Sequence, residues 1–112
     1  MPKKNPLNLN PLQLKTLTLL QELGRALGNE PDGDGAVLID RLPHAHGNHF
    51  HLGDAVVMTA DASGLTNPAV WVVLERKGLL ADNHFPQGAK LTQAGRDYDT
   101  GLSDKILHRS DH

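Results

Sequence analysis

Four histidines lie within eight residues near the middle of the chain, in the pattern H-x-H-x-x-H-x-H. They are His44, His46, His49 and His51. Side chains two residues apart on an extended chain share a face, so each H-x-H pair can present two imidazoles to one metal ion. Zinc, nickel or copper suits such ligands. The same residues also suit a polar loop whose imidazoles bond to backbone and water or titrate near neutral pH.

Catalysis would need more than metal ligands. A metal hydrolase requires an open coordination position and a base, for which Asp54 is available. The chain has no cysteine, no Gly-rich phosphate loop after a strand and no nucleophile elbow. The Asp-Gly-Asp-Gly string at 32–35 cannot form a calcium loop, because Ala36 and Pro43 occupy positions that need side-chain oxygens. We therefore expect no enzyme activity and no required cofactor, with zinc or another transition metal as the one ligand to consider.

The composition is that of one ordinary globular domain. With 112 residues, of which 38% are hydrophobic and 21% charged, the chain can bury one core and is too apolar for full disorder. No apolar run is long enough to cross a membrane, and the first residues lack the apolar block of a secretory signal. Together with the absence of cysteine, this predicts a soluble, cytoplasmic protein.

Charge is distributed unevenly along the chain. The formal net charge is −2, whereas dedicated nucleic-acid binders usually carry an excess of positive charge. Acidic residues dominate from residue 30 to 61, and basic residues outnumber acidic ones from residue 64 to 96. This division permits one-sided contact with phosphate, and it is equally compatible with an ordinary mixed surface.

Capping and turn-forming residues define the elements of the first half. Asn10 and Pro11 predict the start of an amphipathic helix that ends near Gly28, with leucines every three or four residues facing the core. A cluster of turn-forming residues then precedes a predicted strand at 36–39. A second strand, at 48–52, is expected to form a hairpin with the first.

Two helices joined by a tight turn are predicted next. Asp54 can cap a short helix over residues 55–60, and a glycine-containing turn follows. A polar cap and a proline at 66–68 then start a helix that ends before Gly78. This arrangement is a helix-turn-helix. The β-branched valines between residues 69 and 74 favour the alternative of a buried strand there.

These residues, together with those that follow, resemble the winged-helix transcriptional regulators of bacteria, a family that includes the MarR-like repressors. The Gly-Leu-Thr sequence at 64–66 is similar to the family's turn into its recognition helix, residues 74–80 to the exit from that helix, and residues 91–96 to the segment after the wing. The resemblance covers roughly residues 54–98. It implies an α+β fold: a winged helix-turn-helix with three to four helices and a small antiparallel sheet.

The resemblance also implies a function and a set of contacts. The wing would be a β-hairpin with strands at 79–81 and 89–91. Members of the family regulate transcription by binding double-stranded DNA. The expected DNA contacts lie on the second helix of the motif and near the wing: Thr66, Asn67, Arg76, Lys77, Lys90 and Arg96.

One departure from the family pattern keeps a second function open. Trp71 and Val72 occupy positions where the family usually carries polar or basic side chains, and neither offers the hydrogen bonds of direct base readout. Either the protein binds DNA weakly through the phosphate backbone, or the fold is a protein-interaction module that uses Trp71 and Val72 as an apolar contact. The chain's only tryptophan is also a natural core residue.

The two ends of the chain complete the expected architecture. Residues 1–9 are expected to form a flexible arm, and residues 10–108 one winged-helix domain. A final helix is predicted over residues 92–108, with an apolar or aromatic side chain at every fourth position of one stripe. Terminal helices of MarR-like proteins make the dimer, so the resemblance implies a homodimer.

Overall fold

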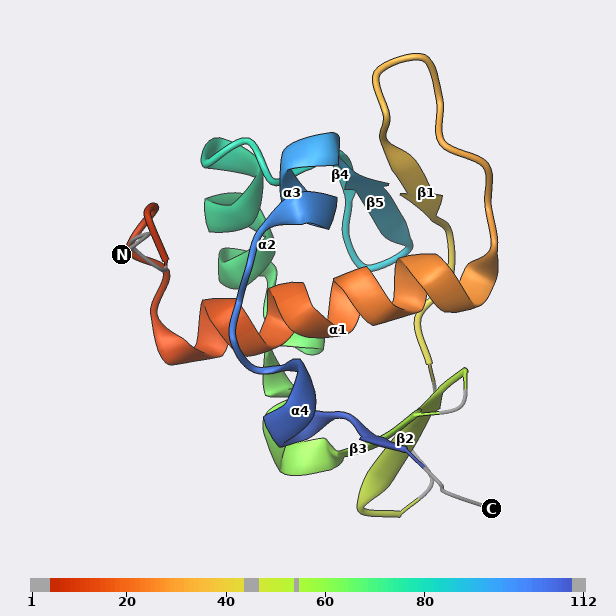
Figure 1. Ribbon diagram of the computed structural model, residues 1–112, viewed down its shortest axis with the longest axis vertical. Coiled ribbons are helices and arrows are strands. Elements are labelled where there is room, and N and C mark those ends of the chain that lie inside the picture. The colour runs from red at the N-terminus through yellow and green to blue at the C-terminus, as the bar shows by residue number, and fades with distance from the viewer. Residues whose placement is uncertain (1–4, 44–46, 54, 110–112) are drawn as a thin grey trace.

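The computed structural model describes residues 5–43, 47–53 and 55–109. Within this part of the chain, helix α1 (Pro11–Leu27) crosses the middle of the molecule. One three-stranded antiparallel sheet and α3 lie on one side of α1, and a second three-stranded sheet and α4 lie on the other side (Figure 1). The fold is therefore α+β, as expected, with two small sheets in place of one. None of the helices in the described ranges is long and apolar enough to cross a membrane.

Helix α1 begins and ends where the sequence predicts. The Asn10 side chain accepts the backbone N–H of Gln13, and the Gln13 side chain accepts the backbone N–H of Asn10, which makes a capping box. Gly28 ends the helix in the left-handed conformation, with φ of 68°. The buried face of α1 carries four leucines: Leu17, Leu19, Leu20 and Leu23.

The first sheet has the strand order β1-β5-β4. Strand β1 (Val37–Ile39) pairs with β5 (Gly88–Leu91), and β5 forms a hairpin with β4 (Leu80–His84). The strands predicted for this region are confirmed, although β4 runs further than predicted. Gly88 is needed in this sheet, because a Cβ atom at that position would collide with the backbone carbonyl of Ile39.

The second sheet has the order β2-β3-β6. Strand β2 (His49–Leu52) pairs with β3 (Ala55–Met58), and β3 pairs with β6 (His108–Arg109). The second predicted strand is confirmed, but its hairpin partner is β3, so the expected hairpin with β1 is wrong. Gly53 follows β2 with φ of 60°, a conformation that suits a tight turn between neighbouring strands.

The short helix predicted at 55–60 is wrong over most of its length, because its first four residues are strand β3. Val56 is half-buried and Val57 is buried, an alternation that a β-strand produces and that β-branched side chains favour. Asp54, the expected cap of that helix, lies outside the described residues.

Two short 3₁₀ turns, η1 (Thr59–Asp61) and η2 (Ser63–Thr66), stand where the first helix of the expected motif would end. Helix α2 (Pro68–Arg76) follows at once. Asn67 caps it, since the Asn67 Oδ1 atom accepts the backbone N–H of Ala69 at 3.0 Å. The second predicted helix is thus confirmed, and the alternative of a strand in its place is wrong.

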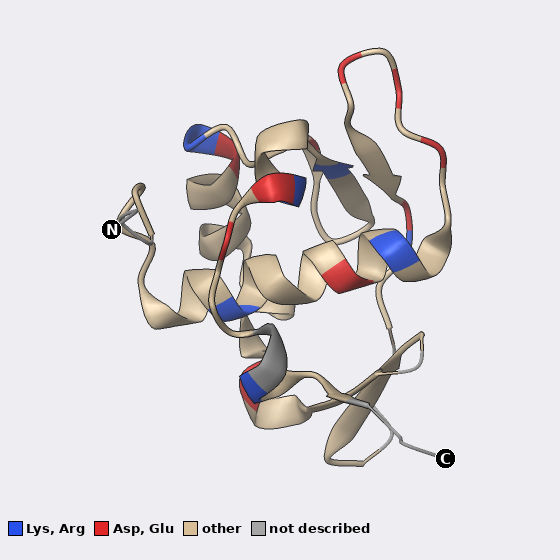
Figure 2. Cartoon of the chain, in the orientation of Figure 1, with Lys and Arg blue, Asp and Glu red and all other residues tan. Residues whose placement is uncertain are grey.

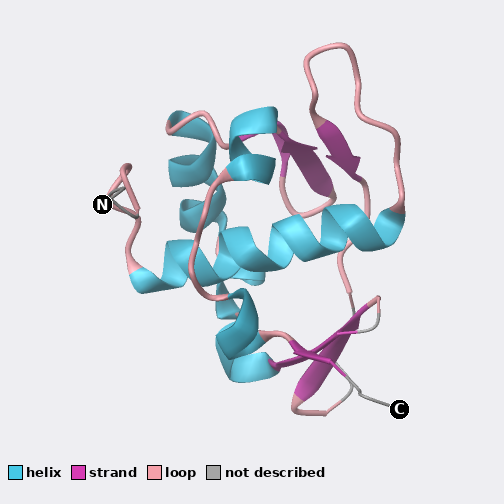
Figure 3. Ribbon diagram, viewed as in Figure 1, coloured by secondary structure: helices cyan, strands magenta, loops and turns pink. Residues whose placement is uncertain are grey.

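The helix predicted at 92–108 is broken. Helix α3 (Gln93–Asp97) and helix α4 (Ser103–Ile106) are separated by the loop that Figure 3 shows between them. The backbone of Tyr98 is extended, and its hydroxyl donates to Asn5 Oδ1 at 2.6 Å. The predicted stripe therefore does not lie on one helix, and its last member, Ile106, is buried in the core.

Residues 5–9 pack against the domain, so the flexible arm predicted at 1–9 is wrong for this part. Leu9 is buried, and the backbone N–H of Leu7 donates to the Tyr98 hydroxyl at 3.1 Å. The residues before position 5 are not described.

One hydrophobic cluster joins α1, α2 and both sheets. Each of these elements contributes a side chain with no more than 1% of its surface exposed: Leu20, Trp71, Leu91 and Val57. Burial of such side chains supplies most of the free energy that favours folding. The cluster fixes α2 against the rest of the molecule and so determines which of its side chains face solvent.

Candidate functional site

Helix α2 turns one face to the core and another to solvent. Val70, Trp71 and Leu74 are buried on the inner face. The outer face carries Ala69 and Val72, both exposed, and it is mostly apolar in its first two turns. Any contact that α2 makes with another molecule therefore involves small aliphatic side chains as well as the polar groups at its two ends.

Trp71 does not belong to that outer face. Its side chain is completely buried, and its ring packs edge-on against Phe85 with 5.2 Å between the ring centroids. The indole Nε1 atom is buried and has no hydrogen-bond partner among the described residues. The alternative that used Trp71 as an apolar contact is wrong for this residue, whereas Val72 is 44% exposed and remains accessible.

Thr66 and Asn67 lie at the N-terminal end of α2, as the sequence predicts. The Thr66 hydroxyl donates to the carbonyl of Ser63 at 3.2 Å, and the Asn67 Oδ1 atom is engaged in capping the helix. Thr66 is exposed and Asn67 half-buried. These two hydrogen bonds hold both side chains next to the N-terminal end of α2.

Arg76 and Lys77 lie at the C-terminal end of the same helix. Both are exposed. The Lys77 ammonium donates to the backbone carbonyl of Leu7 at 2.9 Å, which ties it to the N-terminal segment. Within the described ranges Arg76 makes no ion pair and no side-chain hydrogen bond. This end of α2 therefore carries two cations beside one acid, Glu75, and Arg76 is exposed.

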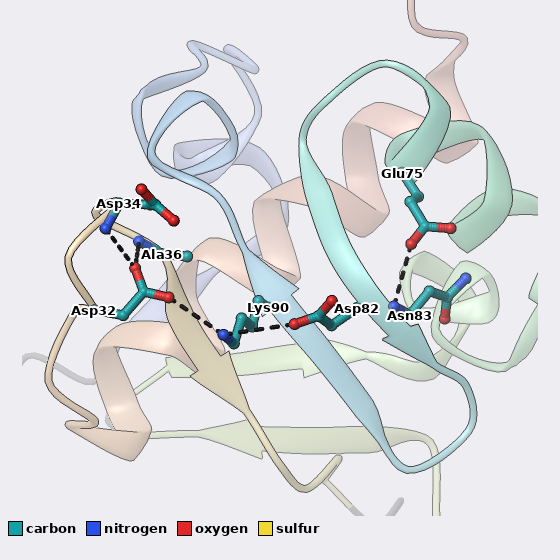
Figure 4. Close-up of polar contacts among 7 residues, drawn as sticks. All are labelled: Asp32, Asp34, Ala36, Glu75, Asp82, Asn83 and Lys90. Atoms are coloured by element: carbon teal, nitrogen blue, oxygen red, sulfur yellow. Dashed lines mark hydrogen bonds and ion pairs between the residues drawn. The ribbon is translucent and has the colours of Figure 1, made fainter.

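Lys90 is held by acidic side chains from two separate segments (Figure 4). Its ammonium lies 3.3 Å from Asp32 and 3.5 Å from Asp82. The Asp32 hydrogen bond and charge, followed by those of Asp82, raise the pKa of Lys90. The pKa of Asp32 is lowered, because the backbone N–H groups of Ala36 and Asp34 donate to its carboxylate and Lys90 lies beside it. The charge that was expected to contact DNA is thus paired with two acidic side chains at the protein surface.

Arg96 also has an internal contact. It lies on α3 and donates to the backbone carbonyl of Gly35 at 2.8 Å. It lines a shallow groove of about 370 Å³ between the end of α1, the loop after it and α3. The groove holds one further arginine, Arg25, and two acids, Glu30 and Asp97, so its charges balance. Figure 2 shows basic and acidic positions interspersed along the described part of the chain.

Of the six predicted DNA contacts, four lie at the two ends of α2, and two lie on other elements. No local pattern predicts the pairing of Lys90 with Asp32, because these residues are 58 positions apart. The excess of acidic residues from 30 to 61 does indicate an acidic partner for Lys90, since the β1-β5 pairing brings part of that region beside β5.

The described part of the histidine cluster is the pair on β2. His49 and His51 place their Nε2 atoms 3.2 Å apart, with ring centroids separated by 4.9 Å. His44 and His46 lie outside the described residues. No group of three or more potential metal ligands is found among the residues that the structure describes. The expectation that an H-x-H pair on a strand shares one face is confirmed for His49 and His51.

No protein-family model, curated protein or solved structure matches the chain. Its function must therefore be inferred from the residues and their contacts.

Proposed function

We propose that the chain is a small winged-helix protein that binds double-stranded DNA weakly, mainly through the phosphate backbone. Support comes first from the order of elements: a long helix, the short strand β1, the inserted β2-β3 hairpin, turns leading into α2, and then the β4-β5 hairpin that shares a sheet with β1. In this arrangement β4-β5 is the wing. In helix-turn-helix proteins the second helix enters the major groove and its N-terminal residues reach the bases.

The observation that carries the proposal is the distribution of polar groups on α2. Asn67 and Lys77 are the two caps of α2, Thr66 lies just before it at the end of η2, and Arg76 is its last residue. A helix laid along DNA with this pattern would contact phosphates with both cations. The aliphatic Val72 between them can contact a thymine methyl group but cannot hydrogen-bond a base edge.

The charges predict low affinity and little sequence discrimination. Lys90 is neutralised by two acids, and Lys77 must leave the Leu7 carbonyl before it can reach a phosphate. Two or three phosphate contacts are then expected, from Arg76, Lys77 and Arg96. Since phosphate contacts position a protein and base contacts give specificity, binding should depend strongly on salt and weakly on sequence.

A second candidate function is supported by the apolar outer face of α2. Ala69 and Val72 are exposed there, Val72 by 44%, although a helix that reads DNA usually carries polar side chains at such positions. The alternative is that the same element binds an apolar surface of another protein. A Val72→Asp substitution would abolish that contact and would also repel DNA, so it cannot separate the two functions. Removal of positive charge can separate them, because it weakens binding to phosphate and leaves the apolar face of α2 unchanged.

The test compares two double variants that lose equal charge. Arg76→Ala with Lys77→Ala removes the cations of α2, whereas Arg41→Ala with Lys105→Ala removes two exposed cations from other elements. Fluorescence anisotropy with a labelled, mixed-sequence duplex at low salt gives the affinities. We expect the first variant to lose about tenfold or more in affinity, and the second to stay within about threefold of the wild type. Equal losses in both variants would contradict a DNA-binding role of α2.

A further inference from the structure

The solvent-facing side of β2 carries two imidazoles. His51 is exposed and His49 is half-buried, while Phe50 and Leu52 alternate with them on the opposite side of the strand. Met58, directly opposite His49 in the β2-β3 register, is also exposed. Both imidazoles therefore lie on one side of β2, which is paired along its length with β3.

The distance between the two rings suits a shared metal ion. An ion bound tetrahedrally with metal–nitrogen distances of about 2.0–2.1 Å separates two nitrogen ligands by about 3.3 Å. The Nε2 atoms of His49 and His51 lie 3.2 Å apart. The same separation allows one N–H···N hydrogen bond between the rings, so a metal ion bound by both nitrogens displaces that proton.

A neighbouring side chain orients one of these rings. The His49 Nδ1 atom lies 3.4 Å from the Asn48 Oδ1 atom. An amide oxygen only accepts hydrogen bonds, so this contact favours the tautomer with the proton on Nδ1 and the lone pair on Nε2. Histidines that bind metal commonly have such a partner for their second nitrogen, because it fixes the ring and the tautomer. Asn48 thus prepares the His49 Nε2 atom to donate to a cation.

From this geometry we infer that His49 and His51 form a binding site for a divalent transition metal of the zinc, nickel and copper group. Imidazole suits these ions, whereas calcium and magnesium prefer oxygen ligands. The two histidines supply two of its coordination positions. The site takes Zn²⁺ in tetrahedral geometry, and the general order of affinities predicts tighter binding of Cu²⁺.

The site is separate from the proposed DNA interface. Strand β2 belongs to the second sheet, which Figure 1 places on the other side of α1 from the β4-β5 hairpin. The inference therefore does not rest on DNA binding, and either proposal can fail alone.

The test is a calorimetric titration of the untagged full chain with ZnSO₄ at neutral pH. The variants are His49→Ala and His51→Ala, and His84→Ala is the matched control, because His84 is an exposed histidine on β4 in the other sheet. Each β2 variant should bind Zn²⁺ at least about tenfold more weakly than the wild type, since even the loss of an outer partner of a ligand costs about 10–100-fold. The control should keep the wild-type affinity. Wild-type affinity in both β2 variants would overturn the inference.

A second measurement does not require any variant to fold. In nitrogen-detected NMR spectra of the wild-type histidine rings, Zn²⁺ should shift the Nε2 resonances of His49 and His51 and leave those of His84, which lies in the other sheet, unchanged. Binding should also weaken on acidification, because protons compete with the metal for the same nitrogen atoms. Unchanged His49 and His51 resonances at saturating Zn²⁺ would contradict the site.

Discussion

The Lys90 ammonium lies 3.3 Å from the Oδ2 atom of Asp32, a residue 58 positions earlier in the chain. The contact joins β5 to the loop that precedes β1, and Asp82 approaches the same ammonium from β4. Three segments of the first sheet therefore share one cation. This arrangement lowers the positive charge that the sheet can present to DNA. The two acids beside Lys90 should therefore weaken the proposed DNA binding.

Removal of these acids should strengthen DNA binding. Asp32→Asn with Asp82→Asn leaves Lys90 charged and without a carboxylate partner, which adds about one phosphate contact. Affinity for a mixed-sequence duplex near 50 mM salt should rise about threefold to tenfold, and the salt dependence should steepen by about one contact. Asp34→Asn with Asp99→Asn is the control, since it gives the same change in net charge at exposed acids that form no ion pair with Lys90. An equal gain in both variants would show that only net charge matters.

Acid should weaken the folded state partly through Asp32. The pKa of its carboxyl lies below the ordinary value of 3.8, because the Ala36 and Asp34 N–H groups and Lys90 favour the ionised form. A carboxyl with a lowered pKa stabilises the fold above pH 3.8, and this contribution is lost as the pH falls through the folded-state value. Urea unfolding at about pH 5 and about pH 3 should show a smaller loss for Asp32→Asn than for the wild type. Asp34→Asn, which removes an exposed carboxylate from the same turn, should behave like the wild type.

Trp71 should matter for stability and Val72 should not. Trp71→Ala leaves a large cavity beside Phe85 and should lower the free energy of unfolding by about 3–5 kcal/mol. Val72→Ala changes an exposed side chain on the same helix and should stay within about 0.5 kcal/mol. Chemical denaturation of both variants checks this. Wild-type stability of Trp71→Ala would mean that the indole is not part of the core.

The first sheet should tolerate no side chain at position 88. In Gly88→Ala the new methyl group would meet the backbone carbonyl of Ile39, which cannot move without disturbing the β1-β5 pairing. We expect a loss of about 1–3 kcal/mol in the free energy of unfolding. Gly33→Ala is the matched control, because a methyl group there enters open space, and its effect should stay within about 0.5 kcal/mol. Equal denaturation midpoints for the two variants would contradict the close approach.

Elements with strong local signals could be predicted from the sequence. The capping box at Asn10 and the Asn-Pro pair at 67–68 fix where α1 and α2 begin, since cap and proline preferences act within one turn. The segment at 55–58 combines a possible helix cap with β-branched residues, and its pairing with β2 decided the outcome. The stripe at 92–108 has helical spacing, yet Tyr98 instead bonds to the N-terminal segment. Long-range contacts of this kind leave no local pattern.

Local patterns likewise predicted one part of the candidate site and missed another. The positions of Thr66 just before α2 and of Arg76 at its end followed from the predicted helix. The neutralisation of Lys90, the hydrogen bond from Lys77 to Leu7 and the burial of Trp71 all depend on residues far away in the chain. Composition and spacing therefore identified candidate contacts but not which charges remain available.

The most direct test of DNA binding is the affinity of the wild-type chain for a mixed-sequence duplex, measured by anisotropy from about 25 to 200 mM salt. With contacts from Arg76, Lys77 and Arg96, the logarithm of the binding constant should fall linearly with the logarithm of the salt concentration, with a slope of about −2 to −3. The Arg76→Ala and Lys77→Ala double variant should reduce that slope by about two. No binding at the lowest salt concentration would contradict the proposed function and favour a protein partner for the apolar face of α2.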